Sequence, residues 1–475
     1  MSRPSTLPPV REQLAARLAP HGQQYLLQFW DELDTAGRRR LASQIEAIDL
    51  NQIAGLFRRA AEAQDWAALS RRAEPPTAMR LADRQGGGLF DAAEARRRGV
   101  EALEGGEVGI LLVAGGQGSR LGFDHPKGLF PIGPVSRASL LQIHFEKAIA
   151  LARRHGAHVP VYMMTSPVTH DEQAEFLEKH GRFGLPADDL FPFRQGTMPA
   201  VDATTGKLLL AERDSLFLSP DGHGGTVAAL AASGAIEHVR RRGIEHLFYL
   251  QVDNPLTPIA DAEFIGYHLL AESDLTSMAV AKQSPQDRLG NFALIDGHMQ
   301  VIEYSDFPDD VAEKRDARGS LVFWAGSIAV HMFSVAFLER ALALKDALPF
   351  HVAHKKVPYL DEAGRLVEPE APNALKFERF IFDLLPHAKN PLVVEYAEEE
   401  VFAPLKNAPG ADRDTAEYVQ RLMVAQHRGW LEAAGTRVAQ SVPVEISPLW
   451  ALDAEGVAAR SDRPASIDQP TYLSE

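Results

Sequence analysis

The sequence predicts an α/β protein in which a central, Rossmann-like mixed sheet is flanked by helices. From Gly109 to about Pro386, short apolar runs alternate with longer segments of helical periodicity, a pattern typical of β-α-β units. Before Arg98, apolar residues recur at three- and four-residue spacing, which predicts a helical N-terminal region. Beyond Asn390 the pattern is less regular and predicts a small C-terminal domain. The predicted domains are residues 1–98, 99–386 and 387–475.

Individual segments supply the strands and helices of this fold. The predicted sheet strands are the apolar runs VGILLVA, HVPVYMMTS, HLFYLQVD and LTSMAVA. Between them we expect helices over residues 139–154, 169–180, 225–242 and 261–273. The segment GNFALIDGHMQVIEYSD places Asp296-Gly297 between two alternating apolar runs, which predicts a β-hairpin and hence antiparallel strands in the sheet. A further helix is expected over residues 415–433 of the C-terminal domain.

The composition restricts both the partners and the chemistry. With 64 acidic and 49 basic residues, the chain has a formal net charge of −15, which disfavours nucleic acid and anionic membranes as partners. It contains no cysteine, so disulfides, thiolate nucleophiles and cysteine-ligated metals are excluded. No uninterrupted apolar stretch approaches the roughly 20 residues that a membrane span needs. We therefore expect a cytoplasmic protein that acts on small molecules.

The stretch Leu111–Gly133, LLVAGGQGSRLGFDHPKGLFPIG, is the strongest functional candidate. Its apolar run ends in Gly115, Gly116 and Gly118, whose backbone can approach a phosphate or a nucleobase closely. The simpler alternative is a tight turn between a strand and a helix. The stretch lacks the ending of a Walker loop, and Gly122 comes one residue late for the dinucleotide fingerprint. A nicotinamide dehydrogenase stays open, although no acidic residue follows a second strand about 20 residues on.

Three charged residues add chemistry to this loop. Arg120 and Lys127 follow the glycines and could clamp an anionic phosphate chain, unless they are solvated surface charges. Asp253 follows the run HLFYLQV, so its carboxylate is expected at the carboxyl edge of a parallel sheet, where α/β proteins bind ligands. There it could hold Mg²⁺ that bridges phosphates, or it could cap the next turn. Together these residues favour nucleotidyl transfer.

The glycine stretch resembles the signature loop of the UDP-sugar pyrophosphorylase family, and is most similar to its eukaryotic-type UDP-N-acetylglucosamine pyrophosphorylases. Further segments resemble the family in family order from about Gly109 to Asn407. They are RQGTMPAVD, LSPDGHGGTVAAL, LQVDNPLTPIADAEFIGYHL, VIEYSD, HVAHKKVPYLD, NALKFERFIFDLLPHA and FAPLKNA. The resemblance implies a fold of the nucleotide-diphospho-sugar transferase type. It also implies attack by a sugar 1-phosphate on the α-phosphorus of UTP, with Mg²⁺ as cofactor and no covalent enzyme intermediate.

The resemblance also assigns roles to individual residues. Those implied to act on the phosphates are Arg120, Lys127 and Lys406, with Asp253 as the metal ligand. Those implied to contact the nucleotide are Ala114, Gly115, Gly116, Gly118, Gln195 and Gly222. Those implied to contact the sugar are His223, Gly290, Glu303, Trp324 and Ser327. The expected substrates are therefore UTP and a hexose 1-phosphate, N-acetylglucosamine 1-phosphate in the first place.

Two departures from the family pattern divide the substrate prediction. In the segment FWAGSIAVH, Trp324 and Ser327 stand where the family usually has asparagines, one of which contacts the sugar. His223 stands where the acetylglucosamine enzymes usually have asparagine and the UDP-glucose enzymes have histidine, although such a histidine could simply brace its loop. UDP-glucose synthesis, or a broader UDP-sugar specificity, is therefore an alternative. A catalytically inactive nucleotide-sugar-binding protein is a third.

Overall fold

The computed structural model describes residues 11–60, 66–344 and 348–475. The chain divides into two compact units. The N-terminal unit consists of residues 1–65, 196–225 and 348–381, and the sheet unit of residues 66–195, 226–347 and 382–475. The domain boundaries expected at residues 98 and 386 stay predictions.

The sheet unit is built on a ten-stranded mixed sheet. Eight strands follow one another in the order β1-β19-β11-β14-β10-β2-β3-β4. They are β1 (Ala78–Met79), β2 (Val108–Val113), β3 (Val161–Thr165), β4 (Leu190–Arg194), β10 (His246–Gln251), β11 (Leu275–Ala281), β14 (Ala325–Ser334) and β19 (Leu392–Tyr396). Every neighbouring pair is parallel except the two that involve β14. The four apolar runs expected as strands are β2, β3, β10 and β11, so the predicted α/β fold class is confirmed.

The remaining two strands of the sheet form the predicted hairpin. Strands β12 (Gly290–Ile295) and β13 (His298–Ile302) pair in antiparallel fashion, and β12 also pairs with β14. Asp296 and Gly297 both have positive φ, at 52° and 82°. Such a pair is what a two-residue turn of type I′ needs, and it explains why Asp-Gly ends one strand and starts the next here.

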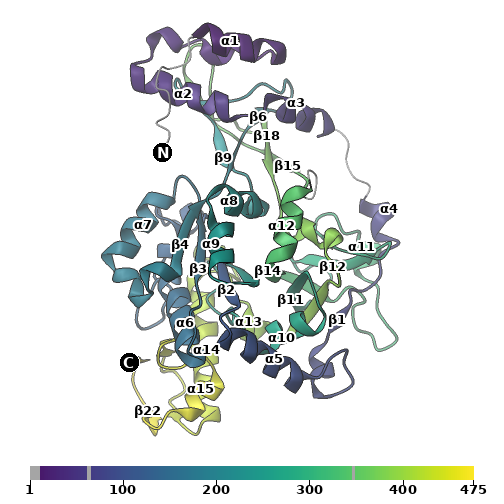
Figure 1. Cartoon of the computed structure of the whole chain (residues 1–475), viewed down its shortest axis with the longest axis vertical. Helices are drawn as coiled ribbons and strands as arrows, with labels where there is room; N and C mark the ends of the chain where they lie inside the picture. The colour runs from purple at the N-terminus through teal and green to yellow at the C-terminus, as the bar shows by residue number, and fades with distance from the viewer. Residues whose placement is uncertain (1–10, 61–65, 345–347) are drawn as a thin grey trace. The chain divides into compact units, whose positions relative to one another are not determined.

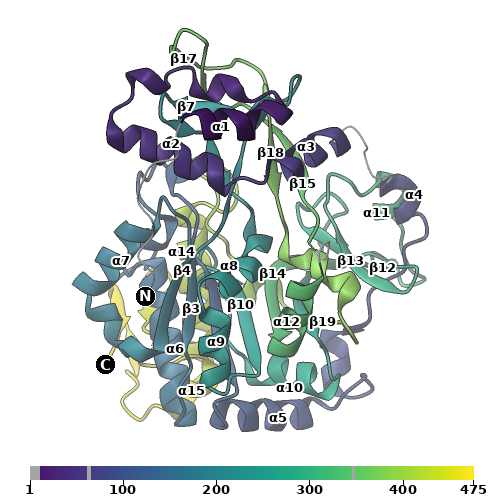
Figure 2. The same ribbon diagram turned by 45° about the horizontal axis from the view of Figure 1, so that its top comes forward.

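Helices cover both faces of the sheet. One apolar cluster joins α5 (Ala92–Glu104), α6 (Leu140–His155) and α10 (Ala262–Leu270) to side chains on one face of β2, β3 and β10. On the other face lie α8 (Thr226–Ala232), α9 (Ala235–Arg241) and α12 (Val335–Ala343) (Figures 1 and 2). The expected single helix over 225–242 is therefore wrong in one respect. Gly234, with φ 79°, is in the left-handed conformation and divides it into α8 and α9.

Further helices and small sheets complete the sheet unit. They are α4 (Trp66–Ser70), α7 (His170–Lys179), α11 (Asp309–Ala312), α13 (Glu398–Val401), α14 (Ala416–Ala433) and α15 (Ala454–Ala459), with β20 (Arg437–Val438), β21 (Val444–Ile446), β22 (Ser466–Ile467) and β23 (Thr471–Leu473). The start of α14 confirms the expected helix over 415–433, because the Thr415 side chain accepts a hydrogen bond from the Tyr418 amide.

The N-terminal unit combines helices with short strands. Its helices are α1 (Arg11–Leu18), α2 (Thr35–Ala47) and α3 (Leu50–Arg59), and its main sheet has the order β15 (His351–Lys355), β18 (Ala374–Glu378), β6 (Val201–Asp202). A shared apolar cluster includes Leu41 and Ile45 of α2 with Leu375 and Phe377 of β18. The expected N-terminal helices are thus present, and α1 to α3 pack on strands that come from much later in the chain.

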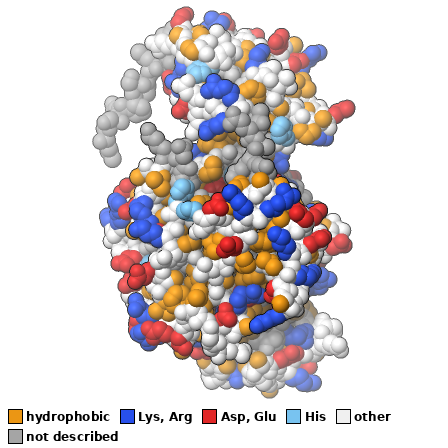
Figure 3. Space-filling model, turned by 90° about the vertical axis from the view of Figure 1, so that its right-hand side faces the viewer, with side chains coloured by type: hydrophobic (Ala, Val, Ile, Leu, Met, Phe, Trp, Pro, Cys, Tyr) orange, Lys and Arg blue, Asp and Glu red, His pale blue; other side chains and the backbone are white. Residues whose placement is uncertain are grey.

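The surface carries charged side chains of both signs. On the face shown in Figure 3, acidic and basic side chains are interspersed around an area of apolar side chains. Over the residues that the structure describes, no helix is both long and apolar enough to cross a bilayer.

Candidate active site

The carboxyl ends of four neighbouring parallel strands bring the predicted phosphate and base residues to one edge of the sheet. Val113 at the end of β2 is in register with Gln251 of β10 and with Met164 of β3, which in turn neighbours β4. The chain leaves these strands into the glycine loop after β2, into Asp253 after β10 and into Gln195 after β4. This edge is where parallel α/β sheets bind their ligands.

Backbone hydrogen bonds fix the glycine loop. The Ala114 amide donates to the Met164 carbonyl at 2.7 Å, and the Ala114 carbonyl accepts from Gln173 Nε2 at 2.9 Å. The Gly116 carbonyl accepts from the Lys127 amide at 3.0 Å, which closes the loop on itself. Gln173 is a buried polar residue of α7 that the sequence analysis missed. Its position on the buried face of an amphipathic helix was the available signal.

Two glycines of the loop are closely approached by other groups. A Cβ atom at Gly118 would lie 2.6 Å from the Phe123 carbonyl oxygen, a backbone atom, so this position requires glycine. A Cβ atom at Gly115 would lie 2.4 Å from Gln195 Oε1, so any larger residue there would displace the Gln195 side chain. The structure therefore places Gln195, the predicted uracil-edge residue, directly against the glycine loop.

The two predicted cations lie in different surroundings. Lys127 Nζ is 3.5 Å from Asp253 Oδ2, and their side chains are only 18% and 10% exposed. Arg120, in a short 3-10 turn over Ser119–Leu121, has an exposed side chain. A lysine and a carboxylate held close together at the sheet edge can engage a phosphate and a cation respectively, whereas Arg120 is free to approach a ligand from solvent.

A small cavity gathers most of the predicted sugar and phosphate residues. It has a volume of about 160 Å³ and lies within the sheet unit. The predicted residues that line it are Asp253, Gly290, Glu303, Ser327 and Lys406. Gly290 and Ser327 come from strands and are direct partners in the pairing of β12 with β14, whereas Asp253, Glu303 and Lys406 come from three loops. The lining also includes Asn254, Arg288, Phe382 and Phe402, which the sequence analysis missed because no spacing rule connects them.

The strand that carries Ser327 is irregular at the cavity. The register of β14 against β11 shifts between Met278 and Ala279, and Ala329 has a positive φ of 55°. The Ala329 amide donates to Ser327 Oγ at 3.4 Å. An irregularity of this kind turns side chains out of their regular alternation. It accounts for the fact that the consecutive residues Ser327, Ile328 and Ala329 all line the cavity.

Trp324 lies away from this cavity. Its side chain is buried, with the Arg80 guanidinium 3.7 Å above the ring centroid, and Arg80 Nε donates to Glu395 Oε2 at 2.6 Å. Trp324 is not among the described residues that line the cavity. The structure thus gives Trp324 a cation-π partner within the fold, and its predicted sugar contact stays a prediction.

Gly222 and His223 belong to the N-terminal unit. Gly222 has φ 82°, and a Cβ there would lie 2.4 Å from the Arg379 carbonyl oxygen, so this turn needs glycine. His223 Nδ1 accepts a hydrogen bond from the Ile381 amide at 3.2 Å, and the ring is stacked on Phe380. The proposed bracing role of His223 therefore has a partner, whereas its part in sugar choice stays a prediction.

The donor set at Asp253 fits magnesium. In the parts of the chain that the structure describes, no three His, Cys, Asp or Glu side chains are grouped as a protein-only metal site would need. Mg²⁺ needs no such group, because it commonly takes one or two carboxylates and completes its shell with substrate phosphates and water. Asp253 supplies one carboxylate beside a cavity that also contains Lys406.

Comparisons with known proteins relate the whole chain to uridylyltransferases and pyrophosphorylases. The model of the UTP–glucose-1-phosphate uridylyltransferase family matches residues 55–455. UDP-N-acetylhexosamine pyrophosphorylase-like protein 1 of Xenopus tropicalis is 36% identical, over 98% of this chain and 92% of its own length. UDP-N-acetylglucosamine pyrophosphorylase of Saccharomyces cerevisiae is 38% identical, over 74% and 75%. The inhibitor complex of the uridine diphosphate N-acetylglucosamine pyrophosphorylase of Trypanosoma brucei has a TM-score of 0.83 at 26% identity, over 99% of both chains.

Proposed function

The chain belongs to the UTP–glucose-1-phosphate uridylyltransferase family, and from this premise we propose that it makes UDP-N-acetylglucosamine and pyrophosphate from UTP and N-acetylglucosamine 1-phosphate. In this reaction a phosphate oxygen of the sugar 1-phosphate bonds to the α-phosphorus of UTP. The bond from the α-phosphorus to the bridging oxygen breaks, and pyrophosphate leaves with that oxygen. Such a transfer depends on positioning and on offsetting negative charge, and needs no nucleophilic side chain.

One observation carries the proposal: Lys127, Asp253 and Lys406 lie together where the strands of the sheet end. Lys127 and Lys406 would stabilise the charge that develops on the phosphates. The exposed Arg120 side chain would approach the same phosphates from the solvent side. Asp253 would hold Mg²⁺, whose charge would offset that of the triphosphate. Ala114 and the glycines would cover the nucleotide, and Gln195 would read the uracil edge with its amide group.

The sugar choice rests on two kinds of support. Gly290, Glu303 and Ser327 share a cavity with Asp253, so a sugar bound there is beside the reacting phosphates. The similar proteins of X. tropicalis and S. cerevisiae are named for N-acetylhexosamine and N-acetylglucosamine. The serine hydroxyl can donate or accept a hydrogen bond, and it leaves more room than asparagine for an acetamido group.

The test is pyrophosphate release by purified protein with UTP and Mg²⁺, comparing N-acetylglucosamine 1-phosphate with glucose 1-phosphate. We expect kcat/KM to be about tenfold or more higher for the acetylated sugar, because a satisfied amide contact is worth about 1.4 kcal/mol or more of discrimination. Preference for glucose 1-phosphate would make the UDP-glucose alternative correct. Absence of pyrophosphate with both sugars would favour the binding-protein alternative.

A further inference from the structure

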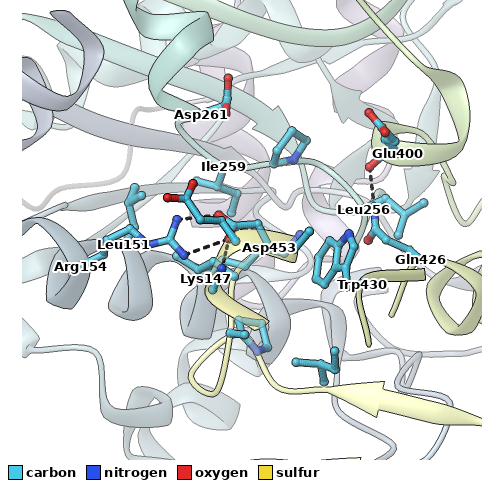
Figure 4. A pocket seen from close by; sticks show the side chains of 18 of the residues that line it. Lys147, Leu151, Arg154, Leu256, Ile259, Asp261, Glu400, Gln426, Trp430 and Asp453 are labelled. Atoms are coloured by element: carbon cyan, nitrogen blue, oxygen red, sulfur yellow. Dashed lines mark hydrogen bonds and ion pairs between the residues drawn. The ribbon is translucent and has the colours of Figure 1, made fainter. Parts of the chain in front are cut away.

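A second and larger cavity lies behind the segment that carries Asp253. It has a volume of about 790 Å³ and lies within the sheet unit (Figure 4). Helices α6 and α14 contribute Lys147 and Trp430 to its wall, and the segment after β10 contributes Leu256 and Ile259. Within this wall, Lys147 is the one residue of α6 whose charged end reaches the segment after β10.

Lys147 binds the backbone of that segment. Its Nζ donates to the Pro255 carbonyl at 2.6 Å and to the Thr257 carbonyl at 2.8 Å. In the described parts of the chain, no carboxylate forms an ion pair with it. Desolvation lowers the pKa of the Lys147 ammonium to about 7. Both the charged and the neutral amine have the two N–H donors that these carbonyls need, so the contact survives across neutral pH.

A second side chain of α6 holds the beginning of the same segment. His144 lies one turn before Lys147, is 2% exposed, and its Nε2 is 3.0 Å from the Val252 carbonyl. Burial lowers the pKa of His144 to about 3, so the ring is neutral and Nε2 is the nitrogen that donates. Helix α6 therefore holds the segment of residues 252 to 257 at both ends, through His144 at its start and Lys147 at its end. Asp253 lies between these two points.

The other side of the segment holds the chain that carries Lys406. Asn254 Nδ2 donates to the Val401 carbonyl at 2.7 Å, and Asn254 Oδ1 accepts from the Ala403 amide at 3.0 Å. The Asp253 carbonyl accepts from the Leu405 amide at 2.8 Å. A shift of the segment would consequently move both the Asp253 carboxylate and the Lys406 amine.

We propose that Lys147 is a positioning residue of the transferase site: by donating to the Pro255 and Thr257 carbonyls, it fixes the segment that places Asp253 and Lys406. The inference rests on the proposed function, because positioning has meaning only for groups that contact the phosphates. An apolar side chain would fill the same space and leave two carbonyls without donors, so the segment would move to find water. Lys147 thus acts through the backbone and touches no substrate.

The first test compares Lys147→Met and Lys147→Arg with Arg153→Met, which removes an exposed cation from the same helix. We expect Lys147→Met to lower kcat by about 10- to 100-fold, with KM for UTP changed less than threefold, because the glycine loop and Gln195 are untouched. Lys147→Arg should restore most of kcat, and Arg153→Met should behave as the native chain. Equal kcat in Lys147→Met and native protein would overturn the proposal.

The second test uses the cavity itself. In Lys147→Ala the missing atoms correspond to n-propylammonium, which the cavity can admit, and this amine should raise kcat severalfold. Tetramethylammonium, a cation without N–H donors, should not. Rescue by both cations alike would show an ionic effect and contradict the donor role.

Hydrogen exchange separates this inference from the proposed function. Without any substrate, Lys147→Met should speed deuterium uptake severalfold in peptides that cover residues 252–257 and 401–406, and Arg153→Met should not. If the native protein makes no UDP-sugar but Lys147→Met still speeds deuterium uptake in these peptides, the proposed function is wrong, whereas the role of Lys147 in holding the segment is confirmed. Unchanged uptake in Lys147→Met, with native kcat, would remove the inference while leaving the function intact.

Discussion

Replacing Asp253 with asparagine should lower kcat for pyrophosphate release by about 100- to 1,000-fold. The substitution keeps the size of the side chain but removes the negative charge 3.5 Å from Lys127 Nζ. A neutral amide is a weaker ligand for Mg²⁺ than a carboxylate, so more magnesium should be needed for half-maximal rate. The Leu405 amide binds the Asp253 backbone carbonyl, which the variant retains, so the melting temperature should change by only a few degrees.

The matched control is Asp171→Asn. This carboxylate is 85% exposed and pairs with Arg194, so its loss should leave both kcat and the magnesium dependence unchanged. Chelation of the metal should abolish turnover of the native protein, and added Mg²⁺ should restore it. Normal turnover by Asp253→Asn would refute the metal assignment and, with it, the role proposed for the Lys127–Asp253 pair.

Local sequence patterns predicted the elements correctly where the conformation depends on one or two neighbouring residues. Asp296-Gly297 specified a two-residue turn, and the β12–β13 hairpin follows directly. The helix expected over 225–242 was predicted too long because its apolar spacing continues across Gly234, whose left-handed conformation ends the helical hydrogen bonding. The packing of α1 to α3 against β6 and β18 depends on contacts between segments that are far apart in the sequence. The periodicity of a single segment carries no information about such contacts.

The site was predictable to the extent that sheet topology determines it. Asp253 and the glycine loop follow strands, and parallel strands end at one edge, so their proximity follows from the order of the elements. Lys147 was not predictable, since its partners are backbone carbonyls 108 and 110 positions along the chain. For Trp324 the residue type was compatible both with stacking on a sugar and with filling core volume. Its contact with the Arg80 guanidinium also depends on a distant segment, and its sugar contact stays a prediction.

A second large effect is expected at the contact between α5 and α10, the helix that begins after the Asp253 segment. A Cβ atom at Gly99 would lie 1.7 Å from the Ala262 carbonyl oxygen, and one at Gly266 would lie 1.6 Å from the Ala95 carbonyl oxygen. Backbone atoms cannot rotate away as a flexible side chain can. Alanine at either position therefore forces the two helices apart along their whole contact.

Gly266→Ala should lower the free energy of unfolding by about 3 kcal/mol, since overpacking of this kind outweighs the gain of up to about 1 kcal/mol from helix propensity. The helix control is Gly429→Ala in α14, where a Cβ would meet no atom within 4 Å. That variant should be slightly more stable than the native chain, because only the propensity term remains. Denaturant unfolding of the two variants measures whether each substitution lowers or raises the free energy of unfolding. If Gly266→Ala were as stable as the native protein, α5 and α10 would be able to separate without cost. A lower free energy of unfolding in Gly266→Ala, but not in Gly429→Ala, would show that the close approach of α5 holds α10 in place.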